Sequence, residues 1–175
     1  NFSINSHNSN PYITNCLTII NNQGGIQNID LTNYKGLVIV NNNIHVTGLT
    51  NYNDIGLLGS GSCTVSNGNH TVYLMGPNCT VNGGSGITTA NLLGTSMNAI
   101  NIMQQGNNLQ IWCDWLGTGS GITNLNNVQR IQCNDGMIAI DTGAGHNAGG
   151  IFRLYEAALN RSADQQGMGY WISQM

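Results

Sequence analysis

Short apolar runs separated by clusters of asparagine and glycine make up most of the chain before residue 147. Within these runs apolar and polar positions alternate and β-branched residues are common, a pattern that predicts short β-strands. Residues 1–11 lack the alternation and are predicted to form an arm or an edge strand. The first strand-like runs are YITNCLTII (12–20), IQNIDLT (26–32), GLVIV (36–40) and NIHVTGLT (43–50).

Between residues 62 and 93 the rhythm becomes finer. Apolar pairs return after seven to nine residues, and the triplet Cys-Thr-Val at 63–65 recurs at 79–81. This spacing is typical of a β-solenoid or β-roll, in which each coil adds two short strands to a stack. Asparagines at equivalent positions of such a stack can form side-chain amide ladders. A sandwich or meander of short strands is the alternative, and the spacing leaves both architectures open.

Two β-hairpins are predicted after this region. Residues 98–116 show apolar alternation on both sides of a Gly-Asn-Asn turn. Residues 127–142 show apolar positions on both sides of Asn134, Asp135 and Gly136. Asp-Gly is a pair that tolerates the positive φ of tight hairpin turns, so we expect the second hairpin to turn there.

From residue 147 the periodicity is helical. Apolar residues recur at i, i+3, i+4, i+7 and i+8, which predicts one apolar helix face. They are Ile151, Leu154, Tyr155, Ala158 and Leu159. Ser162 and Gln165 then have the spacing of a capping box, before a second helix whose apolar residues are Met168, Tyr170 and Trp171. The sequence therefore predicts a mainly-β domain at 1–146 and the start of a helical module, cut short at its C-terminal end, at 147–175.

The run from residue 127 to residue 175 resembles a junction found in many large secreted bacterial proteins. In these proteins a hairpin with the pattern N-V-E-R, a D-G turn and a closing aspartate leads into a helical domain of unknown function. That domain carries R-L-Y-x-A-A and a later Y-W pair, and it often accompanies hemolysin-type calcium-binding repeats in exported toxins, adhesins and surface-layer proteins. The matching positions are Asn127, Val128, Arg130, Ile131, Asp135, Gly136, Ala139, Asp141, Arg153, Leu154, Tyr155, Ala157, Ala158, Arg161, Asp164, Gly167, Tyr170 and Trp171. The resemblance implies an exported protein located outside the cell or at its surface.

The chain departs from this pattern in ways that concern calcium. The stretch closest to the glycine-rich calcium-binding nonapeptide is NGGSGITTA (82–90), and it has Thr88 where the nonapeptide has an aspartate. Because calcium is held by anionic oxygen ligands, we expect no calcium site there. The helical part also differs, since Ala163 occupies the place of the usual proline.

Charged residues are unusually scarce. Only 11 of the 175 residues are Lys, Arg, Asp or Glu, and the net charge is −3. A basic surface that could neutralise phosphates is therefore missing, which argues against a nucleic-acid partner. No apolar run reaches the roughly 18 residues of a membrane span, so none is predicted. Low charge also leaves little repulsion between copies of the chain.

The sequence assigns no catalytic, cofactor-binding or metal-binding residue. GSGSC (59–63) and GTGSG (117–121) lack the G-x-S-x-G spacing of a nucleophile elbow, and the aspartates are isolated from one another. The histidines (7, 45, 70 and 146) match no common zinc-ligand spacing with the cysteines. The cysteines either form one or two disulfides or are buried as small apolar residues, and their connectivity stays open. They are Cys16, Cys63, Cys79, Cys113 and Cys133.

These observations together favour a non-enzymatic extracellular structural protein. We expect a self-assembling subunit or segment of a surface layer, adhesive fibre or filament, with copies of itself as partners. The alternative is a ligand-binding adhesin or virion fibre that recognises surface glycans, for which an exposed Trp112 or Trp115 could stack on a sugar. A lower-ranking alternative is a fragment of a polysaccharide-acting enzyme.

Overall fold

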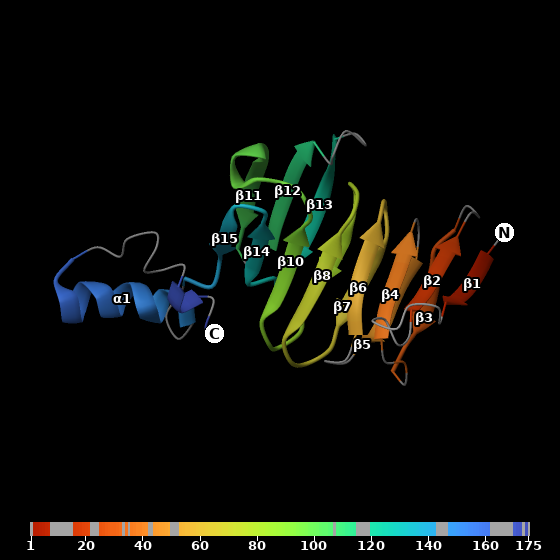
Figure 1. Ribbon diagram of the computed structural model, residues 1–175, viewed down its shortest axis with the longest axis horizontal. Coiled ribbons are helices and arrows are strands. Elements are labelled where there is room, and N and C mark those ends of the chain that lie inside the picture. Colours follow the sequence, from red (N-terminus) through yellow and green to blue (C-terminus); the bar gives the residue numbers. More distant parts are fainter. Residues whose placement is uncertain are drawn as a thin grey trace.

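The computed structural model describes residues 2–7, 16–21, 25–32, 34, 36–41, 44–49, 53–106, 108–114, 120–142, 147–161, 170–172 and 174. These residues form a β-solenoid of two sheets, between which consecutive strands alternate along most of the chain (Figure 1). Helix α1 (Asn147–Leu159) lies beyond the last strands, at the end of the solenoid opposite the N-terminus. The prediction of a mainly-β chain with a small C-terminal helical segment is confirmed. Of the two architectures left open by the sequence, the solenoid is the one that forms.

One sheet has eight strands, in the order β1-β2-β4-β6-β8-β10-β14-β15, and the other has seven, in the order β11-β12-β13-β9-β7-β5-β3. Most neighbours pair in parallel, and antiparallel pairing occurs only toward the ends of each sheet. The bounds of the strands are β1 Phe2–His7, β2 Cys16–Asn21, β3 Gln27–Asp30, β4 Gly36–Asn41, β5 Ile44–Leu49, β6 Asn53–Leu58, β7 Ser62–Val65, β8 His70–Leu74, β9 Thr80–Asn82, β10 Thr88–Leu92, β11 Ile100–Gln105, β12 Asn108–Asp114, β13 Ser120–Asn126, β14 Arg130–Cys133 and β15 Gly136–Ala139.

Columns of apolar side chains fill the space between the sheets. Each column takes one residue from every coil, and its members within regular coils are 17 or 18 residues apart. Fully buried members of two such columns are Val38, Ile55, Val72 and Ala90 in the eight-stranded sheet and Val46, Cys63, Val81 and Leu125 in the seven-stranded sheet. Burial of one such aliphatic side chain contributes roughly 1.5–3 kcal/mol, so these columns are the main source of the solenoid's cohesion.

The Cys-Thr-Val repeat does not mark equivalent positions of two coils. Cys63 pairs in register with Val81, and Thr64 pairs with Asn82, so the repeated triplets are displaced from each other in the stack. The recurrence of apolar pairs after seven to nine residues does match the structure, because it is half of one coil. The sequence also left two strands unnamed, β6 and β13, both of which contain a glycine.

The hairpin predicted over residues 98–116 is confirmed and interrupts one coil of the solenoid. Strands β11 and β12 pair antiparallel from Ile100 with Cys113 to Gln105 with Asn108, and Gly106 takes a positive φ of 62° in the turn. Strand β13 then returns to the stack and pairs in parallel with β9. The coil therefore contains an inserted hairpin that extends the seven-stranded sheet at its end.

The second predicted hairpin also forms, but its turn works differently from the prediction. Cys133 pairs with Gly136, so the loop consists of Asn134 and Asp135. Gly136 is not among the positive-φ glycines of the described chain, so left-handed backbone is not the reason for a glycine here. A Cβ at this position would approach Met97 Cε to 2.8 Å, while Asp135 Oδ1 accepts a hydrogen bond of 2.8 Å from the Met97 backbone N–H. Asp135 therefore holds the backbone of Met97, and Gly136 leaves room for the Met97 side chain.

The N-terminal segment is an edge strand, as one of the two predictions for it stated. Strand β1 pairs antiparallel with β2, from Phe2 with Asn21 to His7 with Cys16. Strand β2 is an integral part of the sheet, because Ile19 is fully buried and β2 also pairs in parallel with β4. At the N-terminal end of this sheet the edge strand is therefore β1, and β2 lies inside the sheet.

Helix α1 forms where the helical periodicity begins, but its apolar face is only partly buried. Tyr155 is buried and Ile151 is half-buried, whereas Leu154 is 60% exposed. The predicted second helix shows a helical segment at 170–172, where Trp171 is 49% exposed instead of being enclosed. The predicted capping box and Met168 lie outside the described residues.

Candidate interaction surfaces

The outer face of the seven-stranded sheet carries the amide ladder predicted from the asparagine content. Asn126 Nδ2 donates a hydrogen bond of 2.8 Å to Asn82 Oδ1, and Asn82 Nδ2 donates one of 3.3 Å to Thr64 Oγ1. These three residues occupy equivalent positions in neighbouring strands. A second rung joins Gln110 Nε2 to Asn124 Oδ1 at 3.1 Å. The prediction of side-chain ladders is confirmed, and the ladder gives this face a neutral polar surface.

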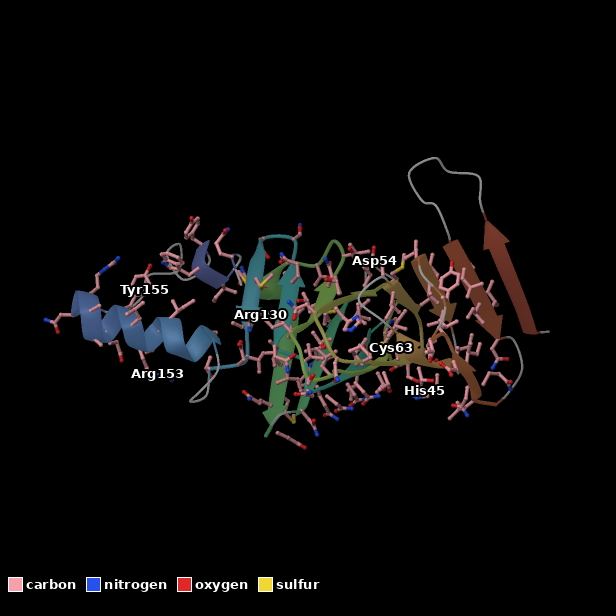
Figure 2. The ribbon with its side chains drawn as sticks, turned by 90° about the horizontal axis from the view of Figure 1, so that it is seen from below. His45, Asp54, Cys63, Arg130, Arg153 and Tyr155 are labelled. Atoms are coloured by element: carbon pink, nitrogen blue, oxygen red, sulfur yellow. The ribbon has the colours of Figure 1, made fainter. Side chains whose placement is uncertain are left out.

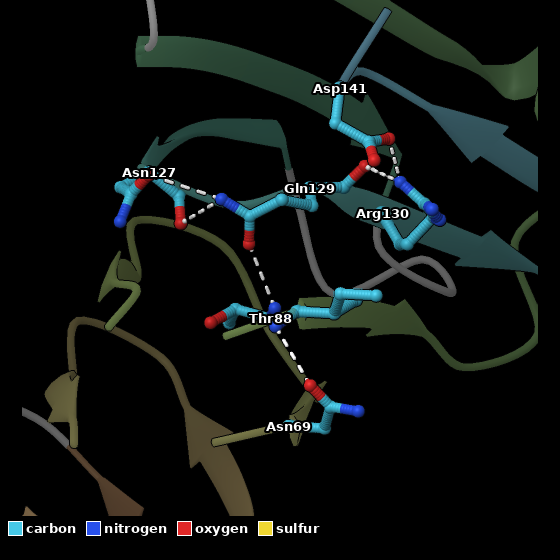
Figure 3. Close-up of polar contacts among 7 residues, drawn as sticks. Asn69, Thr88, Asn127, Gln129, Arg130 and Asp141 are labelled. Carbon is cyan, nitrogen blue, oxygen red and sulfur yellow. Dashed lines mark hydrogen bonds and ion pairs between the residues drawn. The ribbon is translucent and has the colours of Figure 1, made fainter. Parts of the chain in front are cut away.

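A second polar network ties successive coils together at their turns (Figure 3). Asn69 Oδ1 accepts a hydrogen bond from the Ile87 N–H, and Gln129 Oε1 accepts one from the Thr88 N–H, both at 2.9 Å. Asn127, at a positive φ of 51°, donates from Nδ2 to the carbonyl oxygens of Gly83 and Gly84 at 3.2 and 2.6 Å. Each of these side chains satisfies backbone groups of a neighbouring coil. The network therefore stabilises the stack of coils.

Arg130 and Asp141 form a buried ion pair at the last coil (Figure 3). Their side chains are 2% and 6% exposed, and Arg130 Nη1 also donates to the Gln129 carbonyl oxygen at 3.0 Å. Burial lowers the pKa of the Arg130 guanidinium from its ordinary value, but arginine remains protonated in proteins. Asp141 follows strand β15, and its carbonyl oxygen accepts a hydrogen bond from Gly149 in α1. The pair thus fastens the segment that leads to the helix onto the solenoid.

Several residues that match the junction of secreted bacterial proteins make structural contacts. Asn127 bridges two coils, Arg130 pairs with Asp141, and Asp135 anchors Met97. In the helical part, the Arg161 guanidinium lies 5.2 Å from the centre of the Tyr155 ring, a distance typical of a cation–π contact. These contacts give each of the named residues a structural role. Asp164 and Gly167 lie outside the described residues.

Cys63, Cys79 and Cys133 are buried free thiols and Cys113 is buried as well, so the interpretation as small apolar residues fits all four. Cys63 lies in the core of the solenoid (Figure 2). Burial, and secondarily the nearby Cys79, raises the pKa of the Cys63 thiol far above its ordinary value, and burial raises the pKa of Cys79 to about 12. Because the thiolate is the reactive and metal-binding form, these two thiols suit neither role. The side chain of Cys16 lies outside the described residues.

The two histidines whose side chains are described lie in different sheets. His45 Nδ1 lies 2.9 Å from Ser62 Oγ on the seven-stranded sheet, whereas His70 is buried in the eight-stranded sheet. His146 and the side chain of His7 lie outside the described residues. Across the part of the chain that the structure describes, no group of three or more His, Cys, Asp or Glu residues is placed to hold a metal ion.

The aspartates are likewise engaged singly. Asp30 Oδ1 accepts hydrogen bonds from the hydroxyl and, secondarily, the backbone N–H of Thr32, which lower the pKa of its carboxyl group. Asp135 and Asp141 have the partners given above, Asp54 is exposed on β6, and the Asp114 side chain is not described. The described carboxylates therefore show no converging pair of the kind that a glycosidase uses.

The stretch that resembles a calcium-binding nonapeptide has a structural role instead. Thr88 is fully buried at the start of β10, and Gly83 and Gly84 earlier in the stretch pack against the backbone of Asn127 and Ser66. We expect that excess chelator leaves the melting temperature of the protein unchanged. The reason is that Thr88 occupies the position at which the nonapeptide has its calcium-binding aspartate. Thermal unfolding followed by circular dichroism, with and without chelator, tests this. A fall of about ten degrees, several kcal/mol for a domain of this size, would show that calcium is bound.

Two apolar surfaces are exposed in the part of the chain that the structure describes. On the outer face of the hairpin region, half-buried Trp112 lies directly opposite Asn101 and Ile122, and Ile122 is 50% exposed. Trp115 lies outside the described residues. Near the C-terminus, a groove of about 250 Å³ is lined by Ile151, Leu154, Tyr155, Ala158 and Trp171. Figure 2 shows Tyr155 and Arg153 on α1, away from the body of the solenoid.

The edges of the two sheets are the third kind of candidate surface. The eight-stranded sheet ends in β1 and β15, and the seven-stranded sheet ends in β3 and β11. An edge strand offers unpaired backbone N–H and C=O groups, and proteins usually protect it with charges or proline. These four strands contain no proline and one charged residue, Asp30. The ends of the solenoid are therefore weakly protected against pairing with another chain.

The described helices include none that is both long and apolar enough to cross a lipid bilayer. The chain matches no protein-family model, and comparisons with curated proteins and with solved structures give no significant match. The likeness to exported bacterial surface proteins therefore remains a prediction from the residues of the C-terminal third, and the solenoid and its surfaces are the basis for assigning a function.

Proposed function

We propose that this protein is a non-enzymatic extracellular structural protein, a self-assembling subunit or segment of a surface layer, adhesive fibre or filament. The observation that carries the proposal is the composition of the sheet edges, of which only Asp30 bears a charge. Pairing of an edge strand with another chain gives affinity through main-chain hydrogen bonds. A solenoid is suited to such growth because each coil contacts only its neighbours, so added strands continue the same pattern.

The surface chemistry supports the same function. The chain has 11 charged residues and a net charge of −3, so copies repel one another weakly. The outer face of the seven-stranded sheet carries neutral amides that are already paired in a ladder. A location outside the cell or at its surface is part of the proposal, and it is supported by the resemblance of residues 127–175 to exported proteins.

The direct test is the state of assembly of the purified chain. We expect the weight-average mass in sedimentation velocity to rise with concentration up to the high micromolar range, because edge pairing follows mass action. Negative-stain micrographs of the same samples are expected to show ordered oligomers or filaments. A chain that sediments as a monomer throughout this range would contradict the proposal.

Glycan recognition is the second candidate function, and the outer face around Trp112 favours it. The indole there is flanked by Asn101 and Ile122, and the neighbouring Gln110–Asn124 pair adds amide groups. Aromatic rings stack on the apolar faces of sugars, and amides form hydrogen bonds with sugar hydroxyl groups. A dispersed protein that binds a glycan array, and loses binding when Trp112→Ala is introduced, would favour this function over assembly.

A further inference from the structure

Strand β11 is an exposed edge of the described solenoid, with five of its six residues exposed. It is the outermost strand of the seven-stranded sheet and pairs only with β12 among the described strands. In an antiparallel pair, every second residue of the outer strand directs its N–H and C=O away from its partner. Half of the backbone groups of β11 therefore face outward at this edge. Its sequence, INIMQQ, contains no charge and no proline that would block pairing.

The face of β11 that points toward the core carries apolar side chains that are partly exposed to solvent. Ile102 lies directly opposite Ile111, which is fully buried in the core, yet Ile102 is 40% exposed. Ile100 lies opposite the buried Cys113 and is half-buried. The core-facing side chains of the sheet thus continue into β11, where they are less buried than their partners in β12. A strand added next to β11 would bring side chains alongside both isoleucines.

The outer face of the same strand is also apolar at its centre. Met103 is 45% exposed and lies opposite Gln110. An open backbone edge with exposed apolar residues on both faces suits pairing with a further strand. Short segments with high β-propensity, low charge and no proline are those that pair with their own copies.

We infer that β11 pairs antiparallel with β11 of a second copy, across a two-fold axis. This inference rests on the proposed function and names the interface through which assembly begins. A two-fold contact needs one surface that is complementary to itself, and an uncharged strand with alternating apolar and amide residues meets that condition. The pairing joins the two seven-stranded sheets into one continuous sheet. It leaves the N-terminal edge β1 of each copy free for further growth.

The opposite end of the sheet fits β11 less well. A head-to-tail contact would place β3 of one copy against β11 of the next, and β3 has four residues against six in β11. Strand β3 also carries Asp30, whose carboxylate would have to be accommodated at the new interface. The two-fold contact brings no carboxylate to the interface.

The test places a charge at the centre of the edge. Met103→Lys puts two lysines close to each other in the two-fold dimer, and like charges across strands are destabilising. We expect the dissociation constant from sedimentation equilibrium to rise about tenfold or more. The matched control is Ile122→Lys, because Ile122 is exposed on the same face but lies in β13, which pairs on both sides. This control is expected to change the dissociation constant less than about threefold.

Opposite charges at the same position distinguish a two-fold contact from a head-to-tail one. Met103→Glu alone is expected to associate as weakly as Met103→Lys, and an equimolar mixture of the two variants is expected to recover association. Recovery is not expected if β11 meets a different strand. If wild type assembles and Met103→Lys assembles equally well, the inference about β11 is wrong while the proposed function stands.

A measurement on the unaltered protein guards against variants that fail to fold. Amide hydrogen exchange is compared between dilute and concentrated wild-type protein. We expect the amides of residues 100–105 to gain protection on assembly, because the outward N–H groups acquire partners. Assembly that leaves exchange in β11 unchanged would overturn the inference. A wild-type chain that never assembles would overturn both the inference and the proposed function.

Discussion

Replacing Asp141 with alanine is expected to lower the free energy of unfolding by about 3–5 kcal/mol, the usual cost of removing one partner from a buried ion pair. The expectation follows from the position of Arg130, whose side chain is 2% exposed and whose charged partner is Asp141. The variant leaves a buried guanidinium without a compensating charge. Urea unfolding followed by circular dichroism and by tryptophan fluorescence measures the loss.

Removing both charges at once separates the cost of an unpaired charge from the value of the pair. The double variant Arg130→Met with Asp141→Leu is expected to lie within about 1–2 kcal/mol of wild type, because apolar residues of similar volume commonly replace a buried pair with little loss. Glu156→Ala, an exposed position on α1, serves as the control and is expected to change stability by less than about 0.5 kcal/mol. Equal losses in the single and double variants would show that the pair contributes through packing alone.

Gly84→Ala is expected to destabilise the solenoid by about 3 kcal/mol, the upper part of the range for overpacking a close contact. A Cβ at Gly84 would overlap the carbonyl oxygen of Ser66 in the preceding coil. Because the obstacle is backbone, relief requires the two coils to move apart. Gly25→Ala is the matched control, since a Cβ there meets nothing within 4 Å and the expected change is below about 0.5 kcal/mol.

The same denaturation experiment measures both glycine variants. If Gly84→Ala and Gly25→Ala unfold at the same urea concentration, the coils are spaced more loosely at this turn than the structure has them. A Gly83→Ala variant gives a second reading, because its Cβ would overlap the Asn127 carbonyl oxygen of a different segment. Both positions lie in the stretch that resembles a calcium-binding nonapeptide, so the glycines here serve the close approach of coils.

The local elements were predictable from the sequence, and their assembly was predictable only in part. Alternation of apolar and polar residues identified most strands and both hairpins, because alternate residues on a strand face opposite sides of a sheet. The true period was hidden because a buried column accepts any apolar residue of suitable size. Val46, Cys63 and Val81 are equivalent in the stack although their surroundings in sequence differ. The inserted hairpin β11–β12 also breaks the 17- or 18-residue spacing, since Val81 and its equivalent Leu125 are 44 residues apart.

The candidate surfaces were harder to predict than the fold. Asparagine enrichment predicted amide ladders, and the Asn82–Asn126 contact is one of them. The pattern of INIMQQ indicated a strand of a hairpin but could not indicate that it would be the last strand of a sheet, since edge position depends on contacts distant in sequence. Arg130 was singled out by resemblance, and its pairing with Asp141 became clear only when the hairpin brought the two together.

The stacking of coils also determines how the protein responds to tension. Hydrogen bonds between neighbouring parallel strands run along the axis of the stack, so a force applied to its two ends loads them one coil at a time. Each coil of 17 or 18 residues that peels away releases about 60 Å of extended chain. A protein that is anchored at one end and pulled at the other would therefore lengthen in steps. The remaining coils would stay folded, and the chain would extend between two surfaces while limiting the force that is passed from one to the other.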